Sequence, residues 1–295
     1  MNAVVEFRDV WRGFGAHSVL RGLNLEVREG EVFALVGRNG AGKTTALRLL
    51  LGLIESDFGQ ACVFGTPSME LSGAQRDSIG YLSEGHQIEP LRTIHRTLDY
   101  ERCTRTSFDY AFAHDRIERL GLSRGTKVKH LSRGQRAQLG LVLALAGHPR
   151  LLVFDDPALG LDVVMRRELF ESMIDLLASE GTTVLFSTHV FADVERLANR
   201  VGILHDGGLI VDAELDDLRA RVQKRFLWTD SMSDLDHLPG VLSFKPEPDG
   251  ADALILDYDV ELERSLAARG VRASEPRTPN LEDLFVDLTT TGGAQ

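Results

Sequence analysis

A glycine-rich segment, GRNGAGKTT at residues 37–45, constrains the fold of this chain more than any other feature. It follows an apolar run, residues 32–36, with the length and composition of a buried strand, and a helical pattern begins just beyond it. The spacing G-x-x-x-x-G-K-[ST] between a strand and a helix is that of a loop that cradles phosphate groups. The segment therefore predicts a nucleoside triphosphate site at the junction of a strand and a helix.

The residue types of this loop match that chemistry. Three glycines, Gly37, Gly40 and Gly42, let the backbone wrap closely around phosphate oxygens without a Cβ clash. Successive backbone N–H groups and the N-terminus of the following helix supply partial positive charge. Lys43 is placed to reach the β- and γ-phosphates, and the Thr44 hydroxyl is placed to bind Mg²⁺. The predicted nucleotide-binding residues of the loop are Gly37, Arg38, Asn39, Gly40, Ala41, Gly42, Lys43, Thr44 and Thr45.

A second buried strand, residues 151–154, runs directly into two carboxylates, Asp155 and Asp156. A carboxylate pair at a strand end is typical of sites that hold Mg²⁺ and activate water, because Mg²⁺ prefers oxygen ligands. A helical pattern at residues 163–178 and an apolar run at 183–187 follow. Strands that alternate with helices in this way predict an α/β fold with a parallel sheet and crossover helices.

The pattern of the chain changes after about residue 225, where short strand candidates alternate with helical stretches. We therefore predict a nucleotide-binding domain at residues 1–225 and a small α+β accessory domain at residues 226–295. Nearly all of the net charge of −11 lies from Asp206 onward, where acidic residues outnumber basic ones. We expect this excess to form a solvated acidic surface.

Composition argues against several other classes of protein. The N-terminus, MNAVVEFRDV, lacks the basic region and apolar run of a signal peptide. The longest apolar helical stretch, residues 139–146, is far too short to span a bilayer, so a role at a membrane would need another chain's helices. No basic stripe suits nucleic acid, and we expect no nucleic-acid partner. The two cysteines, Cys62 and Cys103, have neither metal-site spacing nor the spacing of a disulfide framework.

Residues 131–135 read LSRGQ, directly before a helical stretch and ahead of the acidic strand. With these motifs the chain resembles the ATP-binding subunits of ABC (ATP-binding cassette) transporters, whose signature is LSGGQ. The resemblance covers nearly the whole chain, with the motifs in the family's order. The phrase PNLEDLFVDLT at residues 279–289 is similar to the end of single-cassette ATPases from the drug and antibiotic export branch.

The resemblance implies roles for individual residues. Phe14 stands where the family has an aromatic ring that stacks on adenine, and Asp162 where a loop bridges two subunits. The implied catalytic residues are Asp156 at the general-base position, His189 at a γ-phosphate contact, and Glu84 in a loop that senses metal and nucleotide. The implied Mg²⁺ residues are Thr44, Asp155 and Glu84. The signature residues that would contact the γ-phosphate held by the opposite subunit are Ser132, Arg133, Gly134 and Gln135.

The resemblance also implies an architecture, cofactors and partners. The implied fold is that of an ABC-type P-loop NTPase, with a mixed sheet core, an antiparallel β subdomain and a helical subdomain at about residues 85–150. The implied cofactors are ATP and Mg²⁺. The implied partners are an integral membrane permease and either a second copy of this chain or a homologous cassette. The implied place is the cytoplasmic face of the cell membrane, where the chain would bind peripherally.

Several positions depart from the family's pattern. Asp156 replaces a glutamate and is one methylene shorter, and a misplacement of about 1 Å can cost about a hundredfold in rate. We expect slowed but real hydrolysis, because phosphoryl transfer depends mainly on positioning and charge stabilisation. Glu84 replaces a glutamine, with Gln87 as the alternative residue for that loop. Arg133 replaces the first signature glycine, and Trp11 is an alternative to Phe14 as the adenine-stacking residue.

Two other functions compete with a transport ATPase. The first is an ATP-binding switch with little turnover, which the residues Asp156 and Glu84 keep open. The second is a soluble ABC protein that works on ribosomes or DNA. Ribosome-associated members usually carry two cassettes, and DNA-repair members carry long coiled coils or zinc modules, whereas this chain has one cassette and neither addition.

Overall fold

The apolar runs that predict a parallel sheet form the centre of the first of two compact units, Met1–Asp212. The computed structural model describes residues 3–177, 182–229, 231–235, 238 and 240–290. Strands β3, β6, β7, β8 and β9 pair with one another in parallel. The edge strand β10 follows β9 after a turn of two residues, 206–207, which is long enough only for an antiparallel pair. The mixed sheet runs in the spatial order β10 (Gly208–Glu214), β9 (Arg200–His205), β3 (Val32–Val36), β8 (Thr183–Thr188), β7 (Leu151–Asp155) and β6 (Ile79–Leu82).

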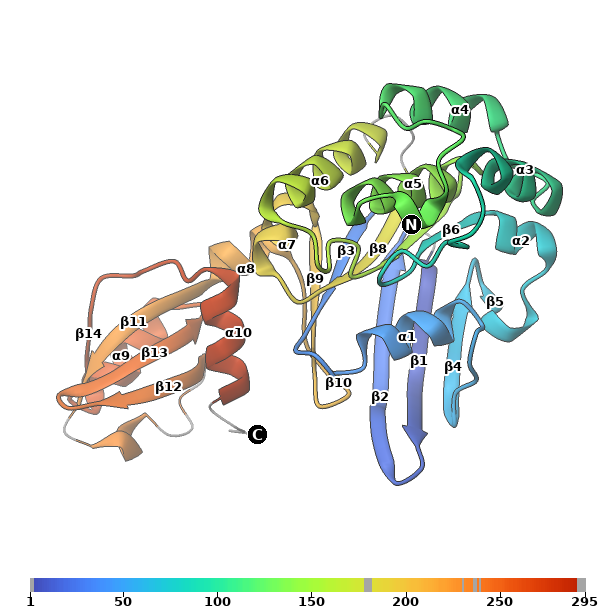
Figure 1. Cartoon of the computed structure of the whole chain (residues 1–295). Helices are drawn as coiled ribbons and strands as arrows, with labels where there is room; N and C mark the ends of the chain where they lie inside the picture. The colour runs from blue at the N-terminus through green and yellow to red at the C-terminus, as the bar shows by residue number, and fades with distance from the viewer. Residues whose placement is uncertain (1–2, 178–181, 230, 236–237, 239, 291–295) are drawn as a thin grey trace. The chain divides into compact units, whose positions relative to one another are not determined.

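Two strands of this sheet are buried along their entire length. Every residue of β7 and of β8 is buried, which explains why residues 151–154 and 184–186 read as continuous apolar runs rather than as an alternation. The crossover helices beside them are α5 (Arg133–Leu145), α6 (Val163–Leu177) and α7 (Phe191–Leu197), as Figure 1 shows.

The first unit contains a second sheet, in which each described strand pairing is antiparallel. It contains, in spatial order, β2 (His17–Arg28), β1 (Ala3–Phe14), β4 (Phe58–Val63) and β5 (Thr66–Pro67). One hydrophobic core joins this sheet to the central sheet through helix α1 (Lys43–Leu50), with Leu47 and Leu50 packed among residues of both. The helix that follows the glycine-rich loop is therefore fixed between two sheets.

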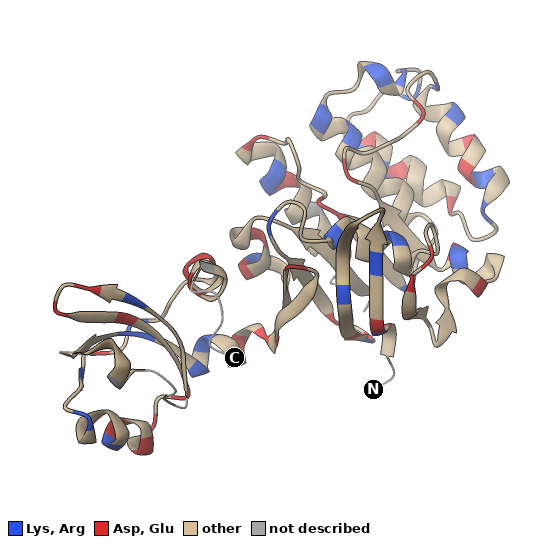
Figure 2. Cartoon of the chain, turned by 90° about the horizontal axis from the view of Figure 1, so that it is seen from below, with Lys and Arg blue, Asp and Glu red and all other residues tan. Residues whose placement is uncertain are grey.

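The helical part of the first unit has its own core, which lies within the segment predicted to be a helical subdomain. Its buried apolar residues run from Ile94 to Ala146. Its helices are α3 (Ile94–Thr104), α4 (Tyr110–Arg119) and α5, with the short α2 (Gly73–Asp77) nearby in the chain. Lys and Arg are interspersed with Asp and Glu along these helices (Figure 2), in exposed pairs such as Arg119–Asp115. Exposed pairs of this kind contribute about 1 kcal/mol at most.

The second unit, Ala213–Gln295, is an α+β unit. Its sheet has the order β12 (Val241–Glu247), β13 (Gly250–Leu256), β11 (Val222–Trp228) and β14 (Arg272–Ala273), and its helices are α8 (Leu215–Arg221), α9 (Val260–Ala268) and α10 (Leu281–Thr290). The predicted boundary between residues 225 and 226 falls inside β11. That strand pairs with β13 over its full length, so residues 222–225 lie in the second unit with the rest of the strand. Among the described residues, no helix has the length and apolar composition that a bilayer span needs.

Replacing Phe186 by alanine should destabilise the first unit by about 3–5 kcal/mol, because the ring is fully buried in β8 at 0% exposure. Urea unfolding followed by Trp11 fluorescence, in a Trp228→Phe background, measures this unit alone. Phe58→Ala is the control, since that ring is 64% exposed, and it should change the free energy of unfolding by about 0.5 kcal/mol or less. Equal effects of the two substitutions would contradict the assignment of β8 to the core.

Candidate active site

The predicted phosphate loop, the carboxylate pair and His189 all follow strands that end at the same carboxyl edge of the central sheet. Strand β8 lies between β3 and β7, and the pairings Val36↔Thr188 and Asp155↔Ser187 align the ends of all three strands. The loop after β3, the carboxylates after β7 and the polar residues after β8 therefore meet at one place. This edge is where open α/β sheets usually bind ligands.

The glycine-rich loop has a backbone that other residues would not allow. Gly42, at φ 109°, lies at the start of α1, and a Cβ there would meet the Leu20 side chain at 2.8 Å. A Cβ on Gly37 would lie 2.5 Å from the carbonyl oxygen of Leu204. The loop thus wraps against β9 and β2 only because these positions are glycine.

Lys43 extends its side chain along the inside of this loop. Its ammonium donates hydrogen bonds to the carbonyl oxygens of Gly37 at 2.6 Å and Arg38 at 3.2 Å, and the residue is only 8% exposed. Burial lowers the pKa of Lys43, while the carboxylates of Asp156, Asp155 and Glu84 oppose that shift. One cation therefore faces three nearby carboxylates, and the site suits a further cation.

Thr44 and Asp155 supply oxygen atoms beside this lysine. The Thr44 hydroxyl donates to Asp155 Oδ1 at 2.9 Å, and the Ser187 hydroxyl donates to the same oxygen at 2.9 Å. Mg²⁺ is usually held by one or two carboxylates together with substrate phosphates, and hydroxyl and carboxylate oxygens are suitable ligands. The donor set at this position therefore fits Mg²⁺ bound with a nucleotide.

Asp156 has an unusual backbone and one free carboxylate oxygen. Its φ is 44°, in the left-handed region that aspartate tolerates better than most residues. Its backbone N–H donates to Ser187, both to the carbonyl oxygen at 3.2 Å and to the hydroxyl oxygen at 3.0 Å. The His189 Nδ1–H donates to Asp156 Oδ2 at 2.6 Å. The other oxygen, Oδ1, is buried without a hydrogen-bond partner among the described residues.

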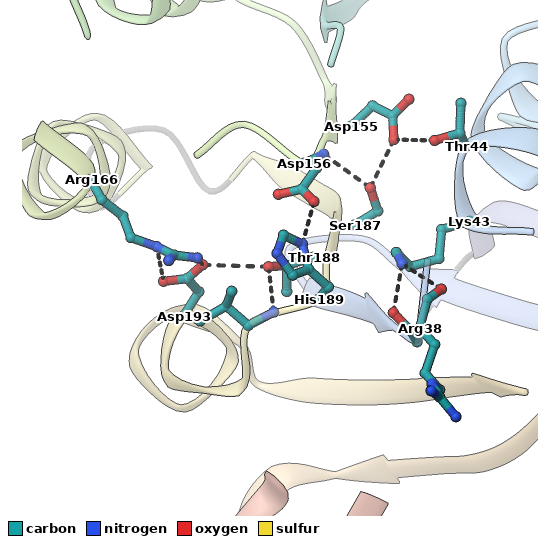
Figure 3. A network of polar contacts seen from close by, with 12 residues as sticks. Arg38, Lys43, Thr44, Asp155, Asp156, Arg166, Ser187, Thr188, His189 and Asp193 are labelled. Carbon is teal, nitrogen blue, oxygen red and sulfur yellow. Dashed lines mark hydrogen bonds and ion pairs between the residues drawn. The ribbon is translucent and has the colours of Figure 1, made fainter. Parts of the chain in front are cut away.

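That free oxygen has a chemical consequence. A buried polar atom that is left unpaired is costly, so its presence beside a binding pocket points to a group that binds there. A water molecule between Asp156 and a bound phosphate would satisfy Oδ1 and would be oriented by it. Figure 3 shows the connected contacts of Thr44, Asp155, Ser187, Asp156 and His189.

An open pocket of about 580 Å³ contains most of these groups. Phe14 lies on its wall, is 51% exposed, and has the Arg12 guanidinium 4.8 Å from the centre of its ring. Trp11 instead donates its indole N–H to Asp9 and is not among the described lining residues. The lining residues are Phe14, His17, Val19, Asn39, Gly40, Gly42, Lys43, Thr44, Thr45, Glu84, Asp155, Asp156 and Ser187.

The loop after β6 carries both Glu84 and the alternative residue Gln87, and the two line different pockets. Glu84 lines the pocket that contains Lys43 and Asp155. Gln87 lines a different pocket, next to the helical part, and its backbone N–H donates to the Ser83 hydroxyl at 3.2 Å. Glu84 is therefore the residue of this loop that faces the phosphate-binding groups.

The signature residues have a different setting. Ser132 caps α5: its hydroxyl oxygen accepts from the backbone N–H of Gln135 at 3.1 Å, and the Gln135 side chain accepts from the backbone N–H of Ser132 at 3.0 Å. Arg133 donates to the carbonyl oxygen of Gly160 at 3.4 Å. Asp162 Oδ1 accepts from the backbone N–H groups of Val164 and Met165. None of Ser132, Arg133, Gly134, Gln135 and Asp162 is among the described residues that line the pocket of Lys43.

Sequence reasoning missed Ser187, which is fully buried and joins Asp155 to Asp156. Its only signal is a polar residue at the end of an otherwise apolar strand, followed by Thr188 and His189. It also missed the contact between Arg166 and Asp193, which lie 27 residues apart and pair at 2.5 Å.

Known proteins match the chain over the segments that build this site. Residues 20–159 match the ABC transporter family. The chain is 31% identical over 294 residues to the Nod factor export ATP-binding protein I of Rhizobium etli, covering 97% of this chain and 93% of that protein. It is 30% identical over 226 residues to the bacitracin transport ATP-binding protein BcrA of Bacillus licheniformis, covering 76% and 74%. A solved ATP-binding subunit of an ABC transporter matches with a TM-score of 0.65 and 29% identity, covering 74% of this chain and 92% of that chain. These matches confirm the predicted fold class.

Replacing Lys43 by alanine should abolish detectable ATP binding, because truncating one partner of a buried charge contact costs about 2–5 kcal/mol or more. Titration of a fluorescent ATP analogue in the presence of Mg²⁺ measures this loss. Lys129→Ala is the matched control, since Lys129 is exposed and distant in sequence from the loop. Tight MgATP binding by the Lys43→Ala protein would refute the assigned phosphate cradle.

Proposed function

The chain belongs to the ABC transporter family, and on that premise we propose that it is the ATP-hydrolysing subunit that powers a separate membrane permease, in an export system. The observation that carries the proposal is the single cluster at the sheet edge. Lys43 and Asp155 line one pocket together with Asp156, whose Oδ1 is buried without a hydrogen-bond partner among the described residues. A phosphate cradle next to an oriented carboxylate is what hydrolysis of a phosphoanhydride needs.

The residues of the cluster divide the proposed reaction among them. The loop N–H groups, the N-terminus of α1 and Lys43 bind the phosphates. Thr44 and Asp155 would hold Mg²⁺, with Glu84 nearby, and the metal would neutralise charge on the phosphate oxygens. Asp156 Oδ1 orients the attacking water and takes its proton, while His189 fixes the other oxygen of that carboxylate. Phe14 offers an exposed ring face to adenine.

The local geometry of Asp156 supports ATP hydrolysis rather than a role as a binding switch with little turnover. Its left-handed backbone brings the short side chain against His189, and two hydrogen bonds from its N–H group to Ser187 hold that backbone in place. Holding a left-handed non-glycine residue costs of order 1–3 kcal/mol, and such strain tends to persist at functional sites. We therefore assign Asp156 as a working base rather than an idle strand-end carboxylate.

The signature segment supports a dimeric enzyme. The N-terminus of α5, capped by Ser132, carries partial positive charge, and residues 132–135 are not among the described residues that line the pocket of its own chain's phosphate loop. In the proposed dimer, Ser132, Arg133, Gly134 and Gln135 contact the nucleotide bound by the opposite cassette, and Asp162 lies at the boundary. Val163, beside it, is 84% exposed, as a surface that a second cassette covers would be. The second cassette is a copy of this chain or a homologue.

A polar pocket supports docking of the permease beside the loop that carries Glu84. The pocket measures about 290 Å³, and Gln87, Arg92 and Glu101 are among its lining residues together with His86. Both ring nitrogens of His86 are buried and without a partner among the described residues, and burial lowers the pKa of this imidazole. A helix of the permease is the proposed occupant, and we further propose that the chain binds peripherally at the cytoplasmic face of the membrane. The export direction rests on the relatives named for Nod factor export and bacitracin transport.

Steady-state Mg²⁺-ATPase assays of the purified chain test the proposal. Wild type should hydrolyse ATP, and Asp156→Asn should lower kcat by about a hundredfold or more, because the amide cannot accept the proton. Asp156→Glu should raise kcat, because it restores the reach of the family's base. Asp206→Asn is the control: Asp206 also has a positive φ and follows a strand, but its side chain is 80% exposed. If wild type binds ATP but hydrolyses it no faster than the Asp156→Asn protein does, the result would favour the binding switch.

A further inference from the structure

A partly buried ion pair connects helices α6 and α7. Arg166 lies in the first turn of α6, and Asp193 in the first turn of α7. The guanidinium binds both carboxylate oxygens, with Nε 2.9 Å from Oδ1 and Nη2 2.5 Å from Oδ2. The Asp193 side chain is only 6% exposed and that of Arg166 25%. Bidentate pairs of this kind fix orientation as well as distance.

The Asp193 end of the ion pair contacts the residues on either side of His189. The Thr188 hydroxyl lies 3.4 Å from Asp193 Oδ2 and accepts a hydrogen bond from the N–H of Val190 at 3.1 Å. The N–H of Asp193 donates to the carbonyl oxygen of Val190 at 3.2 Å. The segment 188–190 is therefore held on both sides of His189, whose ring in turn holds Asp156. Figure 3 shows the contact of Thr188 with Asp193 and that of His189 with Asp156.

The Arg166 end of the ion pair contacts the LGLD loop, residues 159–162. The N–H of Arg166 donates to the carbonyl oxygen of Asp162 at 2.9 Å, and Asp162 Oδ1 caps the first turn of α6. A displacement of this loop would thus move the guanidinium. Apolar side chains would join two helices at least as well as a buried ion pair does, so the directional pair has its main effect on geometry.

We propose that Arg166 and Asp193 are positioning residues that set the place of His189, and through it the Asp156 carboxylate, according to the conformation of the LGLD loop. The inference rests on the proposed function, because it names a control on the same hydrolytic site. Contact of that loop with a second cassette would then be transmitted to the catalytic carboxylate within one chain.

Substitution of the pair should lower turnover without changing nucleotide binding. Asp193→Asn and Arg166→Lys should each reduce kcat by about ten- to hundredfold, since small displacements of catalytic groups have effects of that size. KM for ATP and the affinity for a fluorescent ATP analogue should stay within about twofold. Thr188→Val, which removes the connecting hydroxyl and keeps the side-chain shape, should give the same pattern without disturbing the ion pair.

The matched control is Glu171→Gln. Glu171 on α6 binds Arg196 on α7 at 3.1 Å, so it joins the same two helices, yet it is exposed and does not contact segment 188–190. Its kcat should equal that of wild type.

A second control is non-additivity: in a His189→Ala background, Asp193→Asn should cause no further loss of kcat. Independent, multiplicative losses would overturn the proposal and leave the pair a purely structural role.

A readout that needs no turnover keeps this inference separate from the proposed function. The side-chain ¹⁵N resonances of His189 report its hydrogen bond to Asp156. They should shift in Asp193→Asn and Thr188→Val and stay unchanged in Glu171→Gln. Unchanged His189 resonances in both folded variants would overturn the inference. A wild-type chain without ATPase activity would count against the proposed function alone, while this comparison still decides the positioning role.

Discussion

The parallel pairing of β3, β8 and β7 is the constraint on which the site depends. These strands come from segments far apart in the chain, and their register brings Val36, Ser187 and Asp155 to the same edge of the sheet. A slip of one residue in β8 would turn Ser187 away from both carboxylates, because successive side chains point to opposite faces. Full burial of β7 and β8 resists such a slip, so the hydrophobic core also sets the geometry of the polar groups.

The charges at this edge of the sheet suit a cation bound together with a nucleotide. Lys43 is buried against loop carbonyl oxygens and faces Asp156, Asp155 and Glu84. The two carboxylates have different hydrogen-bond partners. Asp155 accepts hydrogen bonds from the hydroxyls of Thr44 and Ser187. Asp156 accepts one from His189 through Oδ2, and its Oδ1 has no partner among the described residues. These different partners support the proposal that Asp155 holds the metal and Asp156 orients the water.

Local motifs were predictable from the sequence, and contacts between distant segments were not. The phosphate loop and the Asp155–Asp156 pair could be found because each is contained in one strand-to-loop segment. Ser187 was missed because its value depends on the pairing of β8 with β7. Arg166 and Asp193 were missed because a charged residue in the first turn of a helix is ordinarily a solvated one. The two compact units divide between Asp212 and Ala213, ahead of the predicted boundary near residue 225. Membership of β11 in the second unit depends on its pairing with β13, a contact between separate segments.

The measurement that tests the account most directly is the mass of the Asp156→Asn protein in solution, by light scattering, with MgATP and with MgADP. The account predicts a dimer with saturating MgATP, since ATP held by Lys43 of one cassette would be closed over by the LSRGQ segment of another. It predicts a monomer with MgADP, and a monomer in both conditions when Ser132 is also replaced by arginine. A mass that stays monomeric while MgATP is demonstrably bound would contradict the claim that ATP joins two copies of this chain.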